Sequence, residues 1–178
     1  MIHWMNKRTY YKILNIITLA YLAVITFQQN PLKENYSMMS SSFLGYISIF
    51  GLCIFLSLSF IFPTLELSKK HWYLALGPIV GCLFPYTANK GDLLSNIHEV
   101  CAYISFGMCV LLMIINIYHF QQKTFHKRKT LLNIFTIILF LDAVLYLETM
   151  GVVGLEEFIL LSTMVIINDY MYYKNSKQ

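Results

Sequence analysis

The sequence predicts an all-α polytopic membrane helix bundle with six transmembrane helices, and three observations indicate this class. The 178-residue chain is 57% hydrophobic and only 12% charged, whereas a soluble domain typically carries about 25% charged residues. Its apolar residues gather in six stretches, and nearly all charges lie in the short segments between them. The lysines and arginines fall almost entirely in alternate connecting segments. Residues 1–178 therefore form a single integral membrane domain, with lipid as the solvent for much of its surface.

A transmembrane helix requires about 20 mostly apolar residues. The stretches expected to span the membrane are Tyr10–Phe27, Phe43–Phe62, Trp72–Thr87, Ile97–Phe120, Thr130–Glu148 and Gly154–Tyr173. The first has the basic start of a signal peptide but no small-residue cleavage site after it, so we expect a retained helix. The fourth is longer than a membrane requires and should tilt or project outward.

The third stretch is the least regular, because it is short and contains Gly77-Pro78, Gly81 and Pro85. A proline inside a membrane helix frees a backbone carbonyl, which neighbouring groups must then satisfy. We therefore expect this segment to be kinked and packed among the other helices.

The distribution of basic residues predicts the orientation. One side of the predicted bundle holds 11 of the 13, namely Lys7, Arg8, Lys12, Lys69, Lys70, Lys123, Lys127, Arg128, Lys129, Lys174 and Lys177. The other side holds only Lys33 and Lys90. Since lysine and arginine are enriched in cytoplasmic loops, both termini are expected in the cytoplasm, as in a multi-pass protein of the cell (plasma) membrane.

Acidic residues show the opposite bias, and one lies inside a predicted span. Asp142 precedes Glu148 by six residues, which places it about 9 Å below the outer end of the fifth helix at a rise of about 1.5 Å per residue. An ionised group at that depth costs several kcal/mol unless it is paired, and the one basic residue within a predicted span, Lys12, lies at the opposite, cytoplasmic end. Asp142 is expected to have a functional role, or to be a protonated acid that hydrogen-bonds between helices.

His98 opens the fourth helix, as the one histidine expected on the outer side. Helical spacing places it on a small, polar stripe, the kind that faces other helices, formed by His98, Cys101, Ala102, Ser105, Cys109 and Asn116. Next to Asp142, His98 would form an acid–base or proton-sharing pair. The alternative is a histidine that caps or cross-links helices at the interface.

Other chemistry finds little support in the sequence. Adjacent His98 and Glu99 point about 100° apart on a helix, and no zinc-protease spacing occurs, so no metal site is expected. Nucleotide, cofactor and nucleic-acid motifs do not appear. The cysteines are interpreted as small buried hydrophobic residues, and these are Cys53, Cys82, Cys101 and Cys109.

Several short motifs occur in an order that resembles a known family. They are Asn35-Tyr36-Ser37 in the first outer loop, Gly81 to Phe84-Pro85 at the end of the third span, His98, and Gly154-Leu155 before the sixth span. This order resembles the bacterial six-helix membrane family called domain of unknown function 998, which is similar in layout to the Frag/DRAM-like membrane proteins. The resemblance implies the six-helix architecture and an outer ligand-facing surface. The family's basic residue after Gly-Leu is replaced here by Glu156-Glu157.

Three functions remain open at this point. The favoured one is a non-enzymatic protein, surrounded by membrane lipids, whose outer pocket binds a lipid head group, a small ligand or a partner membrane protein. The residues expected to form this pocket are Tyr36, Ser37, Phe84, Pro85, His98 and Asp142. The second is an enzyme acting on a lipid or envelope precursor, with His98 as general base oriented by Asp142 or Glu148. The third is a proton-coupled transporter that uses Asp142.

Overall fold

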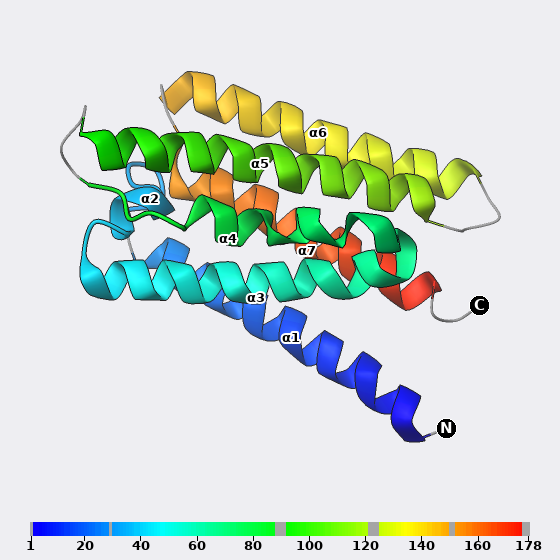
Figure 1. Cartoon of the computed structure of the whole chain (residues 1–178). Helices are drawn as coiled ribbons and strands as arrows, with labels where there is room; N and C mark the ends of the chain where they lie inside the picture. The colour runs from blue at the N-terminus through cyan, green and yellow to red at the C-terminus, as the bar shows by residue number, and fades with distance from the viewer. Residues whose placement is uncertain (1, 29, 88–91, 121–124, 150–151, 176–178) are drawn as a thin grey trace.

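The computed structural model describes residues 2–28, 30–87, 92–120, 125–149 and 152–175, and their regular secondary structure is entirely helical. The elements follow one another as α1 (Ile2–Phe27), α2 (Tyr36–Met39), α3 (Phe43–Leu67), the 3₁₀ helix η1 (Lys69–Leu76), α4 (Gly77–Gly81), α5 (Leu93–His119), α6 (Phe125–Thr149) and α7 (Gly154–Asn175), as Figure 1 shows. The predicted all-α class is confirmed.

Four helices of the described chain are long and apolar enough to cross a membrane. They cover Lys7–Phe27, Phe43–Leu67, Leu93–His119 and Lys127–Thr149, at four of the predicted spans. Helix α7 has 22 residues, or about 33 Å at the α-helical rise, but carries two acids in its first turn and a lysine in its last. Helix α7 is therefore long enough to cross a membrane, but its polar residues make it less apolar than the four helices above.

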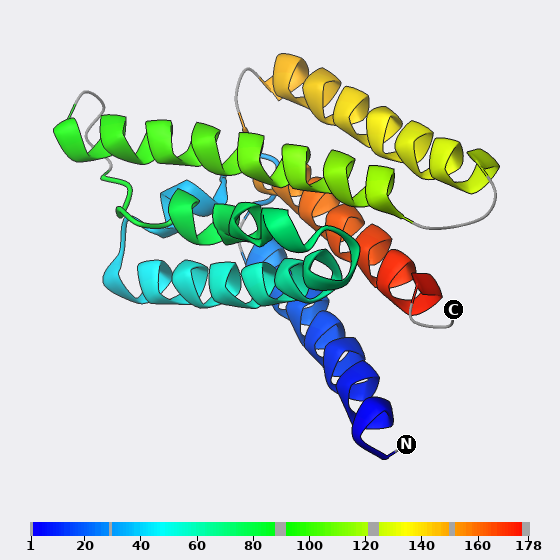
Figure 2. The ribbon, with the colours of Figure 1, turned by 45° about the vertical axis from the view of Figure 1, so that its right-hand side comes forward.

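With η1 and α4 counted as one segment between α3 and α5, consecutive segments run in opposite directions, so that α3 and α5 are parallel (Figures 1 and 2). The start of α1 and the end of α7 lie at one end of the bundle, together with the turn from α3 to η1, the end of α5 and the start of α6. The other end, called the α2 end below, holds α2 and the starts of α3, α5 and α7. Figure 2 shows the first half of α1 projecting away from the other helices. This order is that of an up-and-down bundle.

The third predicted span, Trp72–Thr87, is not one continuous helix. Its helical part ends at Gly81, and the break between η1 and α4 falls at Gly77-Pro78, where proline has no N–H to continue the η1 pattern. A Cβ added to Gly77 would lie 3.1 Å from the Ser105 backbone oxygen. Small residues therefore let α4 pack closely on α5, as small residues do between membrane helices. The expected kink and close packing are confirmed.

A second proline, Pro63, lies inside α3 and leaves the carbonyl of Ser59 without its helical donor. The Tyr11 hydroxyl of α1 donates a hydrogen bond to this oxygen at 3.0 Å. Only 2% of the Tyr11 side chain is exposed, and its ring centroid lies 4.3 Å from that of Tyr172 in α7. One buried tyrosine thus satisfies a helix defect and joins three helices.

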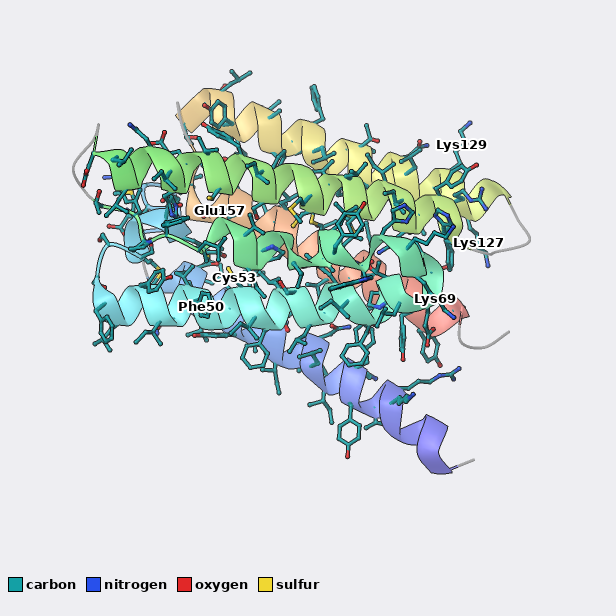
Figure 3. All side chains as sticks on the ribbon, viewed as in Figure 1. Phe50, Cys53, Lys69, Lys127, Lys129 and Glu157 are labelled. Atoms are coloured by element: carbon teal, nitrogen blue, oxygen red, sulfur yellow. The ribbon has the colours of Figure 1, made fainter. Side chains whose placement is uncertain are left out.

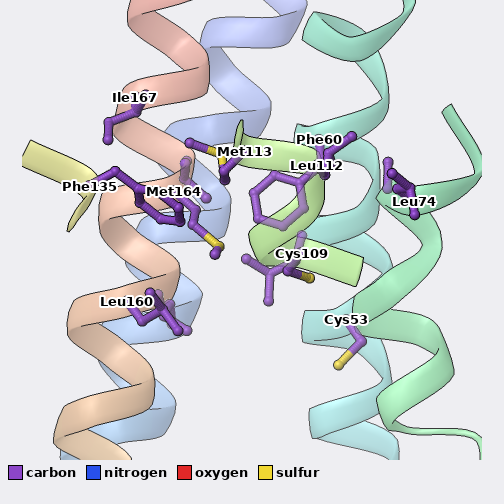
Figure 4. Close-up of a cluster of buried hydrophobic side chains, with 14 of the residues drawn as sticks. Cys53, Phe60, Leu74, Cys109, Leu112, Met113, Phe135, Leu160, Met164 and Ile167 are labelled. Atoms are coloured by element: carbon purple, nitrogen blue, oxygen red, sulfur yellow. The ribbon is translucent and has the colours of Figure 1, made fainter. Parts of the chain in front are cut away.

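Apolar side chains of α3, α5 and α7 fill the centre of the bundle, with Leu112 and Met164 fully buried (Figure 4). A network of hydrogen-bonded polar side chains lies within this core, near the end opposite α2. The Asn116 amide donates to Thr64 Oγ1 at 3.0 Å and to Asn168 Oδ1 at 3.2 Å, and its oxygen accepts from Ser68 at 2.8 Å. Since these groups are satisfied internally, the network connects α3, α5 and α7 without an unpaired polar atom of Asn116.

Replacing Tyr11 with phenylalanine keeps the ring but leaves the buried Ser59 carbonyl unpaired, so we expect a loss of about 1–3 kcal/mol in stability. Thermal unfolding of the purified protein in a mild detergent measures the effect. Tyr10→Phe is the matched control, because Tyr10 is 63% exposed. Equal melting temperatures for the two variants would contradict this role for Tyr11.

Candidate functional site

A cavity of about 160 Å³ opens at the α2 end of the bundle, between five elements. Its walls are mainly aliphatic residues of α3 and α7, including Leu52, Leu56, Leu160 and Met164. Polar groups line it as well, and they are Tyr36 and Ser37 of α2, Ser40 directly after α2, His98 and Ser105 of α5, and Glu157 of α7. None of the described lining residues is a lysine or an arginine. The cavity therefore combines a long apolar wall with polar groups and one acidic side chain.

Residues 82–87, which follow α4, are not helical. The Cys82 and Leu83 N–H groups still bond back to α4, and the other backbone groups require partners from other elements. The Tyr46 hydroxyl of α3 donates to the Cys82 carbonyl at 3.1 Å. Ser40 Oγ, at the C-cap of α2, accepts from the Tyr86 N–H at 3.1 Å, and the Ser95 hydroxyl of α5 donates to the Thr87 carbonyl at 2.7 Å. Three elements thus hold this segment at the edge of the cavity.

His98 supplies a fourth contact to the same segment. Its Nδ1 lies 2.7 Å from the Phe84 carbonyl oxygen and its Nε2 lies 2.8 Å from Ser37 Oγ. Because a carbonyl only accepts, Nδ1 carries the proton, and in the neutral ring Nε2 then accepts from the Ser37 hydroxyl. The side chain is 4% exposed. These contacts agree with the second interpretation from the sequence, in which His98 cross-links separate elements.

Helix α2 is fixed from both sides. The Asn35 side chain caps it by accepting from the Met38 N–H at 2.9 Å, and Glu157 Oε2 accepts from the Tyr36 N–H at 2.8 Å. The Tyr36 hydroxyl lies 2.6 Å from Thr26 Oγ1 of α1. Burial raises the pKa of Tyr36 above its ordinary value, so this hydroxyl stays neutral. These contacts connect α1, α2 and α7 around the cavity mouth.

The loop before α2 is also bonded to the start of α7. Gly154 N–H donates to the Glu34 carbonyl at 2.7 Å, and Leu155 N–H donates to the Pro31 carbonyl at 2.8 Å. A Cβ added to Gly154 would lie 2.9 Å from the Glu34 oxygen. The Gly154-Leu155 motif therefore allows close backbone contact between the start of α7 and the loop before α2.

Three of the predicted pocket residues line the cavity, namely Tyr36, Ser37 and His98. Phe84 contributes its carbonyl to His98 but its ring is exposed, and Pro85 is exposed beside it. Neither of these two is among the lining residues. The sequence indicated the right end of the bundle, while the backbone geometry of 82–87 decides which groups face inward.

The acidic candidates lie apart from His98. Asp142 of α6 is 6% exposed, and its Oδ1 has no hydrogen-bond partner among the described residues. It is close enough to Glu156 of α7, which is also buried, for their charges to interact. Glu148 is exposed on α6. Both ring nitrogens of His98 bond to other groups, so His98 and Asp142 do not form the acid–base pair that was one of the two interpretations of His98.

Sequence reasoning missed two features of this cavity. The sequence analysis gave Glu157 no role in the pocket, although its spacing from Leu160 and Met164 places it on the same face of α7. Cys53 and Cys82 come from separate elements, yet their sulfurs lie 2.9 Å apart. Within the described ranges, no three or more histidine, cysteine or acidic side chains are arranged to hold a metal ion.

Comparison of the chain with family models, with curated proteins and with solved structures found no match. The resemblance to domain of unknown function 998 therefore stays a prediction from short motifs. The site has to be interpreted from its own geometry.

Gly154→Ala should lower the melting temperature, because the new Cβ would meet a backbone oxygen at 2.9 Å and push the first loop away from α7. Gly107→Ala is the control, since its Cβ would meet nothing within 4 Å and alanine favours a helix by about 1 kcal/mol. Thermal unfolding of both variants distinguishes them. A Gly154→Ala protein as stable as Gly107→Ala would show that the loop contact is dispensable.

Proposed function

We propose that the chain is a six-segment protein of the plasma membrane with both termini in the cytoplasm. The placement of charges supports this orientation. Lys69, Lys127 and Lys129 lie at the end of the bundle that holds both chain ends, and Glu157 lies toward the other (Figure 3). Cytoplasmic loops are rich in lysine and arginine, so the α2 end and its cavity would face the outside.

The segment η1–α4 serves as the third crossing in this proposal. Its 8 and 5 residues rise about 24 Å at 3₁₀ and α-helical spacing, and residues 82–87 continue toward the α2 end. A hydrocarbon layer is about 30 Å thick. Irregular backbone at membrane depth is tolerated where protein surrounds it, and η1 and α4 pack against α3 and α5.

The cavity supports a binding function, and the ligand it fits best is a small amphipathic molecule. Its apolar part would lie along Leu52, Leu56 and Met164, and its polar head would lie at Ser37 and Glu157. Ligand sites are mostly apolar clefts with a few placed polar groups. The single observation behind this proposal is that apolar depth and a polar mouth occur in one cavity.

Charge limits the head group further. Glu157 is half-buried and none of the described lining residues is basic. An anionic head would lose hydration without gaining a cationic partner, whereas an amine or a neutral hydroxyl would find acceptors. A cationic or neutral head is therefore favoured. The transporter hypothesis depends on Asp142, which does not line this cavity.

The orientation is tested with single cysteines introduced into a cysteine-free variant. We expect a cysteine at Lys127 to resist a membrane-impermeant maleimide in intact cells and to react after the cells are opened. A cysteine at Lys33 should react in intact cells, because Lys33 is exposed and lies three residues before α2. The reverse pattern would contradict the proposed orientation and place the cavity mouth in the cytoplasm.

Ligand binding is tested with decylamine, decanol and decanoate on protein held in an amphipol. Binding to the folded state raises the melting temperature, and we expect decylamine and decanol to do so more than decanoate. Ala102→Leu should abolish the shift by filling the cavity, since Ala102 lines it.

Ala143→Leu is the matched control, because Ala143 is exposed on α6 and is not a lining residue. Equal shifts for the two variants, or none with any probe in the wild-type protein, would contradict binding in this cavity.

A further inference from the structure

Ser37 and His98 meet in a geometry associated with activated nucleophiles. The Ser37 Oγ to His98 Nε2 distance is 2.8 Å, and the opposite ring nitrogen is held 2.7 Å from the Phe84 carbonyl oxygen. A hydroxyl, a base within about 2.6–3.2 Å and a third group that orients the base are the parts of this arrangement. Phe84 takes the orienting position that the sequence suggested for Asp142 or Glu148.

The tautomer suits the same role. The Phe84 carbonyl requires a proton on Nδ1, so in the neutral ring Nε2 has a free lone pair directed at the Ser37 hydroxyl. Holding the 82–87 segment needs only the Nδ1 contact. The Ser37 side chain forms no other hydrogen bond among the described residues, so the helix α2 cap does not depend on it.

Both groups also face a space that can hold a substrate. Ser37 and His98 line the cavity whose apolar wall includes Leu52, Leu56 and Met164. An apolar chain lying along that wall would bring its polar end to the mouth, where the Ser37 hydroxyl is half-buried. A nucleophile at the polar end of an apolar cavity matches an ester whose acyl part is a hydrocarbon chain.

We propose that Ser37 and His98 form a nucleophile–base pair that cleaves acyl esters of hydrocarbon chains bound in this cavity. The proposal rests on the amphipathic ligand binding proposed above and specifies the ligand as a substrate. The absence of lysine and arginine from the described cavity lining, together with Glu157, favours a neutral or cationic alcohol as the leaving group.

The reaction is an acyl transfer to serine followed by hydrolysis. Ser37 Oγ bonds to the acyl carbon while its proton passes to His98 Nε2 and the carbonyl π electrons move to the oxygen. As these electrons return, the ester C–O bond breaks and the Nε2 proton goes to the leaving alkoxide, giving an alcohol. A water then attacks the acyl-serine, with Nε2 taking its proton and returning it to Ser37 Oγ. The net change is ester plus water to carboxylic acid plus alcohol.

The test uses a fluorophosphonate probe with a decyl chain, which forms a covalent phosphonyl ester with activated serines. The full-length protein in an amphipol is incubated with the probe, and the modified peptide is located by mass spectrometry. Hydrolysis of p-nitrophenyl decanoate is followed in parallel. We expect modification at Ser37 and ester turnover above that of empty amphipol.

The variants separate base catalysis from folding. Ser37→Ala removes the nucleophile, and His98→Asn keeps an N–H donor for the Phe84 carbonyl while it removes the base. Each should lower labelling and turnover at least tenfold, since general bases contribute about 10²–10⁴-fold, while the melting temperature stays near that of the wild type. Ser41→Ala is the control, because Ser41 is exposed and does not line the cavity.

Two results would overturn the inference alone, and a third would overturn the proposed binding with it. One is a wild-type protein whose melting temperature rises with decanol but which is neither labelled at Ser37 nor active on the ester. This outcome would leave ligand binding intact and remove only the catalytic step. The other is labelling or turnover that His98→Asn leaves unchanged. A wild-type protein that neither binds decanol nor decylamine nor reacts would contradict the proposed binding as well.

Discussion

The backbone of residues 82–87 constrains the architecture of the α2 end. Only the N–H groups of Cys82 and Leu83 bond back to α4, and a bilayer would offer no water to the remaining backbone groups of the segment. Its carbonyls and N–H groups are met by Tyr46, Ser40, His98 and Ser95, which come from three different elements. The same requirement explains the Tyr11 bond to the carbonyl that Pro63 leaves open in α3. Helix breaks are therefore tolerated where long-range side chains satisfy them.

The cavity is a consequence of these bonds. A regular third helix would have placed continuous side chains beside α3 and α5, whereas the short α4 ends at Gly81 and leaves space between α2, α3, α5 and α7. His98 then carries two duties, because Nδ1 fixes the Phe84 carbonyl and Nε2 meets Ser37. A residue that secures the fold thereby also presents a basic nitrogen to a hydroxyl at the cavity mouth.

The candidate site could be predicted only in part. His98 stood out as the one histidine predicted on the outer side at the start of a span, and Tyr36 and Ser37 belonged to the predicted first outer loop. Asp142 stood out as an acid inside a span, yet it faces α7 and Glu156 rather than His98. The position of Asp142 along α6 predicts its depth in the bundle, but it does not predict which side chain of a neighbouring helix lies beside it. Glu157 was the opposite case, a boundary acid that packing directs into the cavity.

The sequence by itself determined the helical class, the position of four apolar spans and the segregation of basic residues, because these depend on local composition and on the thickness of a bilayer. It also indicated the irregular third segment, since Gly77-Pro78 interrupts a helix locally. Only the tertiary structure decided that the Phe84 carbonyl, His98 and Ser37 form one chain of hydrogen bonds. Phe84 and Ser37 lie 14 and 61 residues from His98 in sequence. Their contacts arise from the packing of separate helices, which local sequence patterns do not predict.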